Sequence, residues 1–467
     1  MVIDDEADFA SPNSKINQDE QTRINELITL ILGKHGDYIG VTATPARLDL
    51  NNTFDNDNQL WVAFPPHKMY TGQDLFFPLE GPRAGWNRPY EFQLTLLPDR
   101  GDDPRYARQA LFSFLVNVAY LNLHVNEQET NYSMLVHTSG KKVDHKSDWD
   151  VIYETLSTLV DHDATKFERY VRQIWDLGRD RYSDVNPDLL TQYIIENISR
   201  NTVIILNSDR DFRQNGSSAT KPASLFTVVI GGNIVSRGVT FDNLLSMFFT
   251  RDVKHKIQQD TYIQRARMFG NRGQYLQFFE LTIPRQLYAD WHRCFVFHKL
   301  ALEAIREGMG SPVWLSDKRI AAVASSSIDK STVDLDKGEM AFRIFEFTEG
   351  LDALVQSKLS NSEKLDELGA ILGVSSFPTY LRRFIIRTSA SLEASLVLHP
   401  SASIEGYKDE PGLDKAAIER RRGFFGSSQM GNHPGAIHHL KIFTNAAKQG
   451  RLFYKFDGSI QFIKNIK

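Results

Sequence analysis

The chain opens with Met1-Val2-Ile3-Asp4-Asp5-Glu6-Ala7-Asp8, which places consecutive acids directly after a short apolar strand. Such a strand end is typical of domains that present carboxylates to a phosphate-bound magnesium ion. Apolar residues then recur at helical spacing over residues 20–34. The next predicted strand, Tyr38 to Val41, runs into Thr42-Ala43-Thr44-Pro45. The order strand, helix, strand indicates part of a parallel α/β domain.

The composition is that of a globular chain. The 467 residues imply two or three domains, since single cores stop growing at about 250–300 residues. The net charge of −4 gives no overall basic field, so any nucleic-acid contact would come from local patches. Cys294 is the only cysteine, which excludes an internal disulfide and fits a cytoplasmic location. No apolar run approaches the roughly 20 residues that span a bilayer, so we expect no membrane partner.

The pattern along the chain predicts four regions. Residues 1–65 form the remnant of a first α/β lobe, and residues 66–104 are a linker with short strands. Residues 105–290 form a second α/β lobe, because several short apolar runs there are typical of parallel strands buried on both faces. Residues 291–467 form a mixed, mainly helical C-terminal domain where a partner would bind.

The C-terminal domain has the weaker patterns. We expect a helix near residues 436–448, a small hairpin at 451–463, and a strand in the preceding lobe at Leu276 to Phe279. His433, His438 and His439 have no carboxylate or thiolate partners at metal-ligand spacing, so we interpret them as surface or loop histidines.

The acidic strand end suggests a role in ATP hydrolysis. Asp5 would hold magnesium through its water shell, and Glu6 would polarise the attacking water. Thr42 and Thr44 follow the next strand, where small hydroxyl residues can sense the γ-phosphate and relay its state to a neighbouring domain. The alternatives are a frayed acidic terminus and a simple turn made by threonine and proline.

Two motifs in the second lobe suggest contact with a phosphate. Gly231 to Thr240 follows a buried strand, and its glycines allow close approach of a ribose or phosphate, or else a tight turn. In the segment Asp260 to Arg272, Gln264 and Arg267 share one helix face, and we expect Arg272 to project from a turn at Gly270. Two such arginines could act as arginine fingers on a phosphate across a cleft. The alternative is a solvated basic helix.

One expected motif is missing. The phosphate-binding loop, Gly-x-x-x-x-Gly-Lys-Ser/Thr, occurs nowhere in the 467 residues. Without its lysine and backbone N–H groups, the β- and γ-phosphates lose their main ligand. We therefore expect this chain alone neither to bind ATP tightly nor to hydrolyse it, as for a fragment whose first half-domain is absent.

The order of these motifs resembles superfamily-2 helicase-like ATPases, and more narrowly their Z1-domain branch, over roughly residues 1–290. The stretches that carry the resemblance are Ile3 to Asp8, Tyr38 to Pro45, Met134 to Ser139, Gly231 to Thr240, and Asp260 to Arg272. The chain departs from the family pattern at Ala266, where a glycine usually precedes the first finger arginine.

The resemblance implies an α/β fold with RecA-like lobes, and ATP and Mg²⁺ as cofactors. It implies the following site residues: Glu6, Arg267 and Arg272 as catalytic; Asp5 as the metal-binding acid; Asp5, Thr42, Thr44, Gly238 and Gln264 at the nucleotide; and His137, Thr138, Ser139 and Thr240 at the nucleic acid.

The resemblance also implies a function and partners. The chain would be part of a DNA-dependent ATPase or translocase of bacterial restriction or anti-phage defence. Its partners would be double-stranded DNA, a nuclease subunit of the phospholipase-D-like type, and the missing N-terminal ATPase half. An alternative is a non-catalytic scaffold that links a nuclease to DNA. A weaker alternative is an RNA helicase.

Overall fold

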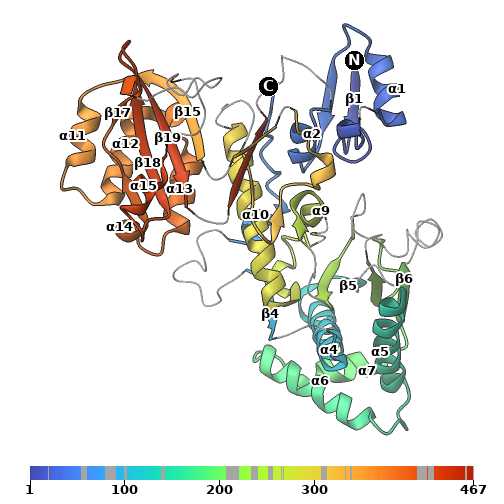
Figure 1. The fold of residues 1–467 in the computed structure, drawn as a ribbon. Coiled ribbons are helices and arrows are strands. Elements are labelled where there is room, and N and C mark those ends of the chain that lie inside the picture. Colours follow the sequence, from blue (N-terminus) through green and yellow to red (C-terminus); the bar gives the residue numbers. More distant parts are fainter. Residues whose placement is uncertain are drawn as a thin grey trace. The chain divides into compact units, whose positions relative to one another are not determined.

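The computed structural model describes residues 1–18, 20–53, 60–78, 91–98, 102–137, 142–206, 220–232, 240–250, 256–264, 266, 268–306, 313–331, 333–336, 339–406, 418, 425–457 and 460–465. The chain divides into two compact units, and Figure 1 labels their helices and strands. Unit 1 contains Met1–Pro65, Lys256–Asp260 and Val296–Lys467, and unit 2 contains Pro66–His255 and Thr261–Phe295.

Unit 2 is built on a six-stranded parallel sheet with the order β4-β11-β8-β5-β7-β6. The strands are β4 (Gln93–Leu97), β5 (Tyr132–His137), β6 (Asn201–Leu206), β7 (Phe226–Gly231), β8 (Leu244–Phe249) and β11 (Glu280–Pro284). Every residue of β7, β8 and β11 is buried, as expected for parallel strands covered on both faces. The predicted α/β fold, a parallel sheet with flanking helices, is confirmed.

Helices α4 (Pro104–Tyr120), α5 (Lys142–Val160), α6 (Phe167–Arg181) and α7 (Pro187–Asn197) share one hydrophobic core with this sheet. Helix α4 begins where the Asp103 side chain accepts from the Arg105 N–H, with Pro104 at the first helical position. A π-helix, η2 (Leu121–Val125), follows it. Helix α10 (Arg285–Arg306) places Trp291 against Phe249 of β8, with ring centroids 5.1 Å apart.

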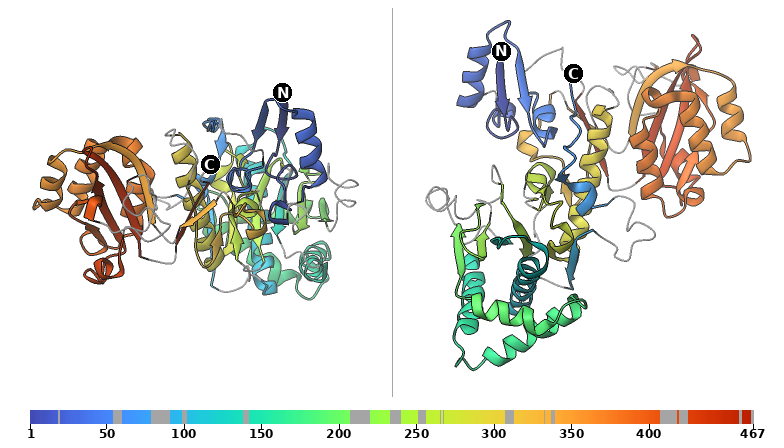
Figure 2. Two further views of the ribbon diagram at one scale, coloured as in Figure 1. Left: turned by 45° about the horizontal axis from the view of Figure 1, so that its top comes forward. Right: turned by 180° about the vertical axis from the view of Figure 1, so that it is seen from behind.

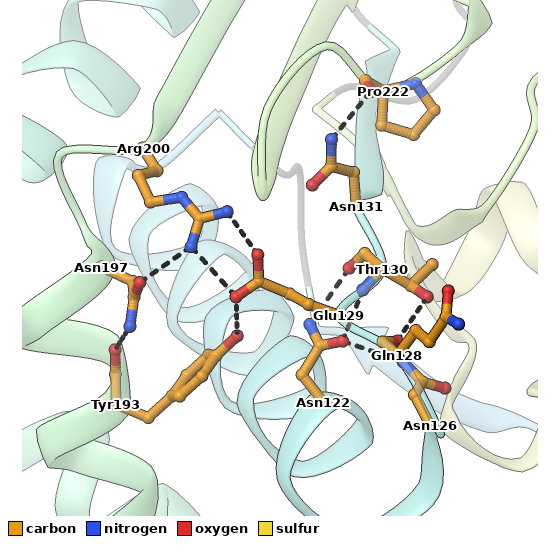
Figure 3. A network of polar contacts seen from close by, with 10 residues as sticks. All are labelled: Asn122, Asn126, Gln128, Glu129, Thr130, Asn131, Tyr193, Asn197, Arg200 and Pro222. Carbon is orange, nitrogen blue, oxygen red and sulfur yellow. Dashed lines mark hydrogen bonds and ion pairs between the residues drawn. The ribbon is translucent and has the colours of Figure 1, made fainter.

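A polar network braces the amino ends of β5 and β6 (Figure 3). Arg200, just before β6, donates to both carboxylate oxygens of Glu129. Tyr193 also donates to Glu129, at 3.3 Å. The hydrogen bond from Arg200 holds the pKa of Glu129 below its usual range, and burial raises the pKa of Tyr193 to about 12. The network stabilises the edge of the sheet opposite to the carboxyl ends of the strands.

The segment expected as a linker, residues 66–104, is instead part of unit 2. It supplies β4, the short helix α3 (Gln73–Phe76), and β3 (Tyr70–Thr71), which pairs with β10 (Gly270–Asn271). The ring of Phe76 lies 5.4 Å from that of Phe279, and the ring of Phe77 stacks on Phe295 at 4.7 Å. The strand expected at Leu276 to Phe279 is wrong, because η4 (Leu276–Phe278) is a 3₁₀ turn and β11 begins at Glu280.

The N-terminal part of unit 1 has the expected order of strand, helix and strand. Strand β1 (Val2–Asp5) pairs in parallel with β2 (Tyr38–Val41), and α1 (Arg23–Leu32) connects them. Helix α2 (Ala46–Asn51) follows, and its residues Ala46 and Leu50 share a core with Ala301, Trp314, Ala322, Val323, Ile328, Val333 and Ile463. Residues near both ends of the chain therefore fold together.

Hydrogen bonds fix this joint core. The buried carboxylate of Asp49 accepts from the Trp314 indole N–H at 2.7 Å, and the Asp49 carbonyl accepts from the Asn465 amide at 2.8 Å. The Asn51 amide donates to the carbonyls of Asn13 and Ser327, both at 3.0 Å. A small sheet, β12 (Val313–Ser316)-β20 (Gln461–Asn465)-β14 (Val333–Asp336), carries Trp314 and Asn465.

The rest of unit 1 is mixed, as expected, but its centre is a sheet (Figures 1 and 2). Strands β15 (Glu339–Glu346), β19 (Gln449–Phe456), β18 (His438–Thr444) and β16 (Leu396–Leu398) lie in this order, and β17 (Ala402–Ser403) also pairs with β18. The helices are α11 (Gly350–Gln356), α12 (Asn361–Ser376), α13 (Thr379–Thr388), α14 (Leu392–Ser395) and α15 (Ser427–Gly431).

Two C-terminal predictions are wrong. The helix expected at residues 436–448 is strand β18, which is paired on both sides. The hairpin expected at 451–463 does not form, because β19 pairs with β15 and β18 while β20 pairs with β12 and β14. Short β9 (Ile257–Gln258) and β13 (Ile320–Ala321) complete the strands of unit 1 in the described part of the chain. None of the helices described is long and apolar enough to cross a lipid bilayer.

Candidate functional site

The acidic strand end and the threonine motif lie at the same edge of the β1–β2 sheet. The parallel register pairs Asp5 with Val41, so Glu6 and Thr42 leave the two strands side by side. The Ala7 N–H then donates to the Val41 carbonyl at 3.1 Å. The structure therefore brings together two motifs that are more than thirty residues apart in the sequence.

Asp8 connects the two motifs, and its role was not foreseen from the sequence. Its carboxylate is fully buried. One oxygen accepts from the Thr42 hydroxyl at 2.6 Å, and the other accepts from the Thr44 hydroxyl at 2.9 Å. The Thr44 N–H also donates to the Thr42 hydroxyl at 2.9 Å. Because a buried carboxylate needs donors, the two threonines and Asp8 hold one another in place.

Asp4 is occupied by structural contacts. Its carboxylate accepts from the Tyr38 hydroxyl at 2.6 Å and from the Ser11 hydroxyl. Burial, together with the Asp4 carboxylate, raises the pKa of Tyr38 well above its usual range. Among the four acids of the opening stretch, Asp4 and Asp8 thus support the fold, whereas Asp5 and Glu6 are exposed.

The backbone at Glu6 has an uncommon conformation. Its φ of 55° lies in the left-handed region, and its N–H donates to the Asp5 carboxylate at 3.0 Å. For a residue other than glycine, this conformation costs about 1–2 kcal/mol. Strained backbone of this kind gathers at functional sites, where the rest of the fold maintains it.

The chemistry of Asp5 fits magnesium binding through water. Magnesium retains several waters and is bound through one or two carboxylates plus phosphate oxygens. Among the described residues, no three histidine, cysteine or acidic side chains form a metal-binding group. A magnesium ion at Asp5 would therefore need phosphate oxygens and water to complete its shell.

In unit 2, one predicted residue, His137, lies at the carboxyl edge of the parallel sheet. His137 ends β5, and the register pairs it with Gly231 of β7 and Phe249 of β8. The His137 ring lies 5.0 Å from the Phe249 ring, and the His137 carbonyl accepts from the Thr250 N–H at 3.2 Å. Thr240 is exposed. Ligands of parallel α/β sheets bind at this edge.

Some predicted site residues lie outside the part of the chain that the structure describes. These are Thr138, Ser139, Gly238 and Arg267, together with the side chain of Gln264. Their roles stay predictions.

The prediction that Arg272 projects toward a phosphate is wrong for this structure. Its side chain is 2% exposed. The guanidinium donates to the Phe241 carbonyl at 2.8 Å and to the Tyr275 hydroxyl at 3.0 Å. The turn expected at Gly270 is the start of β10, which pairs with β3. Arg272 therefore lies directly after β10 in the core of unit 2. Its hydrogen bonds connect the segment around Phe241 with the segment around Tyr275.

Comparisons with known proteins add a domain assignment. Residues 107–308 match the Z1 domain. The match covers the predicted second lobe and confirms the expected similarity to the Z1 domain for that part of the chain. No curated protein matches the chain.

A solved structure, that of the Mycobacterium smegmatis helicase Lhr bound to ssDNA and AMP-PNP, is similar at 12% identity and a TM-score of 0.29. The similarity covers 81% of this chain and 38% of the Lhr chain. A likeness this low supports no conclusion about fold or function.

Proposed function

We propose that this chain is part of a DNA-dependent ATPase or translocase of the superfamily-2 helicase-like class. The observation that carries the proposal is the edge of the β1–β2 sheet, where Asp8 binds Thr42 and Thr44 while Asp5 and Glu6 stay exposed. The Z1 domain match over residues 107–308 supports it.

In this proposal the exposed acids perform the nucleotide chemistry. Asp5 would hold the magnesium ion of the bound ATP through water, and Glu6 would orient the water that attacks the γ-phosphate. Thr42 and Thr44 would sense the γ-phosphate. Asp8 accepts a hydrogen bond from each threonine, so it would pass a shift of these side chains to the backbone that follows β1. Magnesium supplies charge neutralisation at the phosphates when it is bound.

The second unit would supply charge and nucleic-acid contacts. We propose Arg267 as the arginine finger, and Gly238 and Gln264 as nucleotide contacts. Arg272 is not included, because its guanidinium is bound within unit 2. We propose that His137, Thr138, Ser139 and Thr240 contact the nucleic-acid backbone near the carboxyl edge of the sheet.

The chain would need another part to complete the nucleotide site. Helix α1 exposes Ile24, Leu30 and Ile31 at 49%, 69% and 72%, and the paired strands expose Ile3 at 63% and Val41 at 50%. Because α1 packs beside β1, we propose that these exposed apolar side chains form one binding surface. We propose that the occupant is an α/β half-lobe that carries the Gly-x-x-x-x-Gly-Lys-Ser/Thr loop, since this chain lacks that loop.

The proposed setting is bacterial restriction or anti-phage defence in the cytoplasm, with double-stranded DNA and a phospholipase-D-like nuclease as partners. This setting follows from the family resemblance alone. A second candidate is a non-catalytic scaffold that joins a nuclease to DNA. The burial of Arg272 favours it, since a residue expected to be catalytic serves the fold.

ATP turnover tests the proposal. The chain alone should show no turnover above a Glu6→Gln variant. Adding an N-terminal half-lobe that carries the phosphate-binding loop should give turnover that double-stranded DNA stimulates more than RNA does. Arg267→Ala should abolish that turnover. If Arg267→Ala leaves the assembled complex fully active, the scaffold is the better description.

A further inference from the structure

Histidine and lysine side chains from three strands meet on one face of the C-terminal sheet. Residues alternate between faces along a strand, so His439 and Lys441 of β18 share a face. The antiparallel register sets Lys455 of β19 directly beside His439. His399 follows β16, and its N–H donates to the Leu440 carbonyl at 2.8 Å.

The histidines form a connected group. His399 Nε2 lies 3.0 Å from His439 Nδ1, and the two rings stack with centroids 5.2 Å apart. The exposed His433 places its ring 5.4 Å from that of His399. His438 and His439, expected at the surface, are instead fully buried in β18.

The hydrogen bonds determine which nitrogens carry protons. His439 Nε2 lies 3.3 Å from the Ala436 carbonyl, which only accepts, so this nitrogen carries the proton. In the neutral ring, His439 Nδ1 then accepts from His399 Nε2. His399 Nδ1 is left without a proton, so it is the position where the pair can take one up.

Two lysines add positive charge beside the histidine pair, since Lys441 acts on His399 and Lys455 acts on His439. Lys441 is half-buried, makes no ion pair within the described residues, and lies with Nζ 4.7 Å from the Phe443 ring centroid. Burial lowers the pKa of Lys441. Burial, and then His439, His433 and Lys441, lower the pKa of His399 to about 4.

A metal ion does not account for the cluster. Among the described residues, no group of three histidine, cysteine or acidic side chains could hold one. Burial lowers the pKa of His439. The exposed carboxylate of Asp457 partly offsets this shift, and Lys455 adds to it. Within the described residues, the cluster thus places lysine and imidazole side chains beside Asp457, and lysine and imidazole groups are donors that bind an anion.

We propose that His399, His433, His439, Lys441 and Lys455 form a binding site for a phosphate group. The lysines would act as point charges, and His399 would become an N–H donor to the phosphate by taking up a proton at Nδ1. The phosphate belongs either to a small phosphate ion or to the phosphodiester backbone of a nucleic-acid strand. The proposal stands on the C-terminal sheet alone and does not depend on the proposed ATPase role.

Calorimetric titration of the 467-residue chain with inorganic phosphate at pH 6 and constant ionic strength tests the site. Lys441→Met and His433→Gln should each weaken binding about tenfold or more, because the first removes a charged donor and the second removes an exposed imidazole. Lys358→Met, an exposed lysine before α12, should bind phosphate as the unmodified chain does. Circular dichroism confirms that the variants are folded.

Two results overturn the proposal. One is the absence of phosphate binding by the unmodified chain, and the other is unchanged affinity in both Lys441→Met and His433→Gln. His433 is exposed, so its variant remains informative if Lys441→Met folds poorly.

A parallel titration identifies the source of the phosphate. It uses a single-stranded oligodeoxynucleotide without terminal phosphates. Binding that Lys441→Met weakens assigns the site to a phosphodiester backbone. Oligonucleotide binding that does not change in this variant, together with weakened binding of inorganic phosphate, assigns the site to a small phosphate. Binding should also take up protons, seen as a heat that depends on the ionisation enthalpy of the buffer.

Discussion

At the scale of single residues, Asp8 carries most of the organisation of the candidate site. It separates the opening acids into two classes, because it and Asp4 face hydroxyl donors while Asp5 and Glu6 remain exposed. The sequence indicated that acids and threonines belong together, but not which acid would join them. Which acid meets the threonines depends on the backbone conformation after β1, including the left-handed conformation of Glu6.

Replacing Asp8 tests this assignment. Asp8→Asn keeps the shape but replaces two charge-assisted acceptors, so we expect a loss of about 1–3 kcal/mol in the free energy of unfolding. In the completed assembly, ATP turnover should fall as well. Denaturant unfolding and turnover assays measure both effects. Asp37→Asn, an exposed acid beside β2, should change neither.

Arg272 offers a second test at this scale. Arg272→Ala leaves the Phe241 carbonyl and the Tyr275 hydroxyl without this donor. We expect a loss of about 2–3 kcal/mol of stability without any nucleotide present. Urea unfolding measures it, with Arg169→Ala on the exposed side of α6 as the control. An Arg272→Ala chain as stable as the unmodified one would return the residue to a catalytic role.

At the scale of secondary structure, the sequence predicts best where the signal is local. The continuous apolar runs of β5 and β7 and the spacing of α1 led to the right elements. The prediction failed at β18, which is a strand because it pairs with β16 and β19. The pairing with β16 joins residues far apart in the sequence, so no local pattern reveals it. Arg272 was misplaced for the same reason, since β3 lies about two hundred residues before β10.

His438, one of the two buried histidines of β18, makes stability dependent on pH. His438 lies between the Tyr454 hydroxyl at 2.8 Å and the Thr388 hydroxyl at 2.9 Å, and burial lowers its pKa to about 4. A lowered pKa favours the folded state above the ordinary value near 6.5, and this stability is lost as pH falls toward 4. The full effect is roughly 3 kcal/mol.

Unfolding experiments between pH 7 and pH 4 measure this dependence. His438→Gln should flatten the slope over that range, whereas His35→Gln, an exposed histidine, should leave it as it is. An equal slope in the chain with His438→Gln would show that other groups cause it.

At the scale of the whole molecule, the chain does not divide into consecutive domains. It passes between the two units after residues 65, 255, 260 and 295. The sequence gives no sign of this, because the joint core of α2, Trp314 and Ile463 depends on contacts between the two ends.

Removing residues 461–467 tests the joint core. The truncation deletes β20, and with it the bond from Asn465 to Asp49 and the packing of Ile463 on Trp314. We expect residues 1–65 to become sensitive to limited proteolysis, while the parallel sheet of unit 2 stays protected. Protection of residues 1–65 in the truncated chain would contradict the joint core.

The exposed apolar face of α1 gives a test of assembly. Leu30→Lys and Ile31→Lys should leave stability nearly unchanged, because the two side chains are 69% and 72% exposed. They should block binding of an added half-lobe, measured by size-exclusion chromatography. Ile371→Lys, a change at a 50% exposed residue of α12, should not.

The joint core also has a consequence during synthesis. Leu50 leaves the ribosome well before Ile463, because about four hundred residues separate the two core positions. At a translation rate of about 5–20 residues per second, the first segment waits roughly 20–80 s for its partner. Over that interval the isoleucines and leucines of the segment around Leu50 are available to chaperones and to other nascent chains. Yield in the cell should therefore depend on chaperone supply.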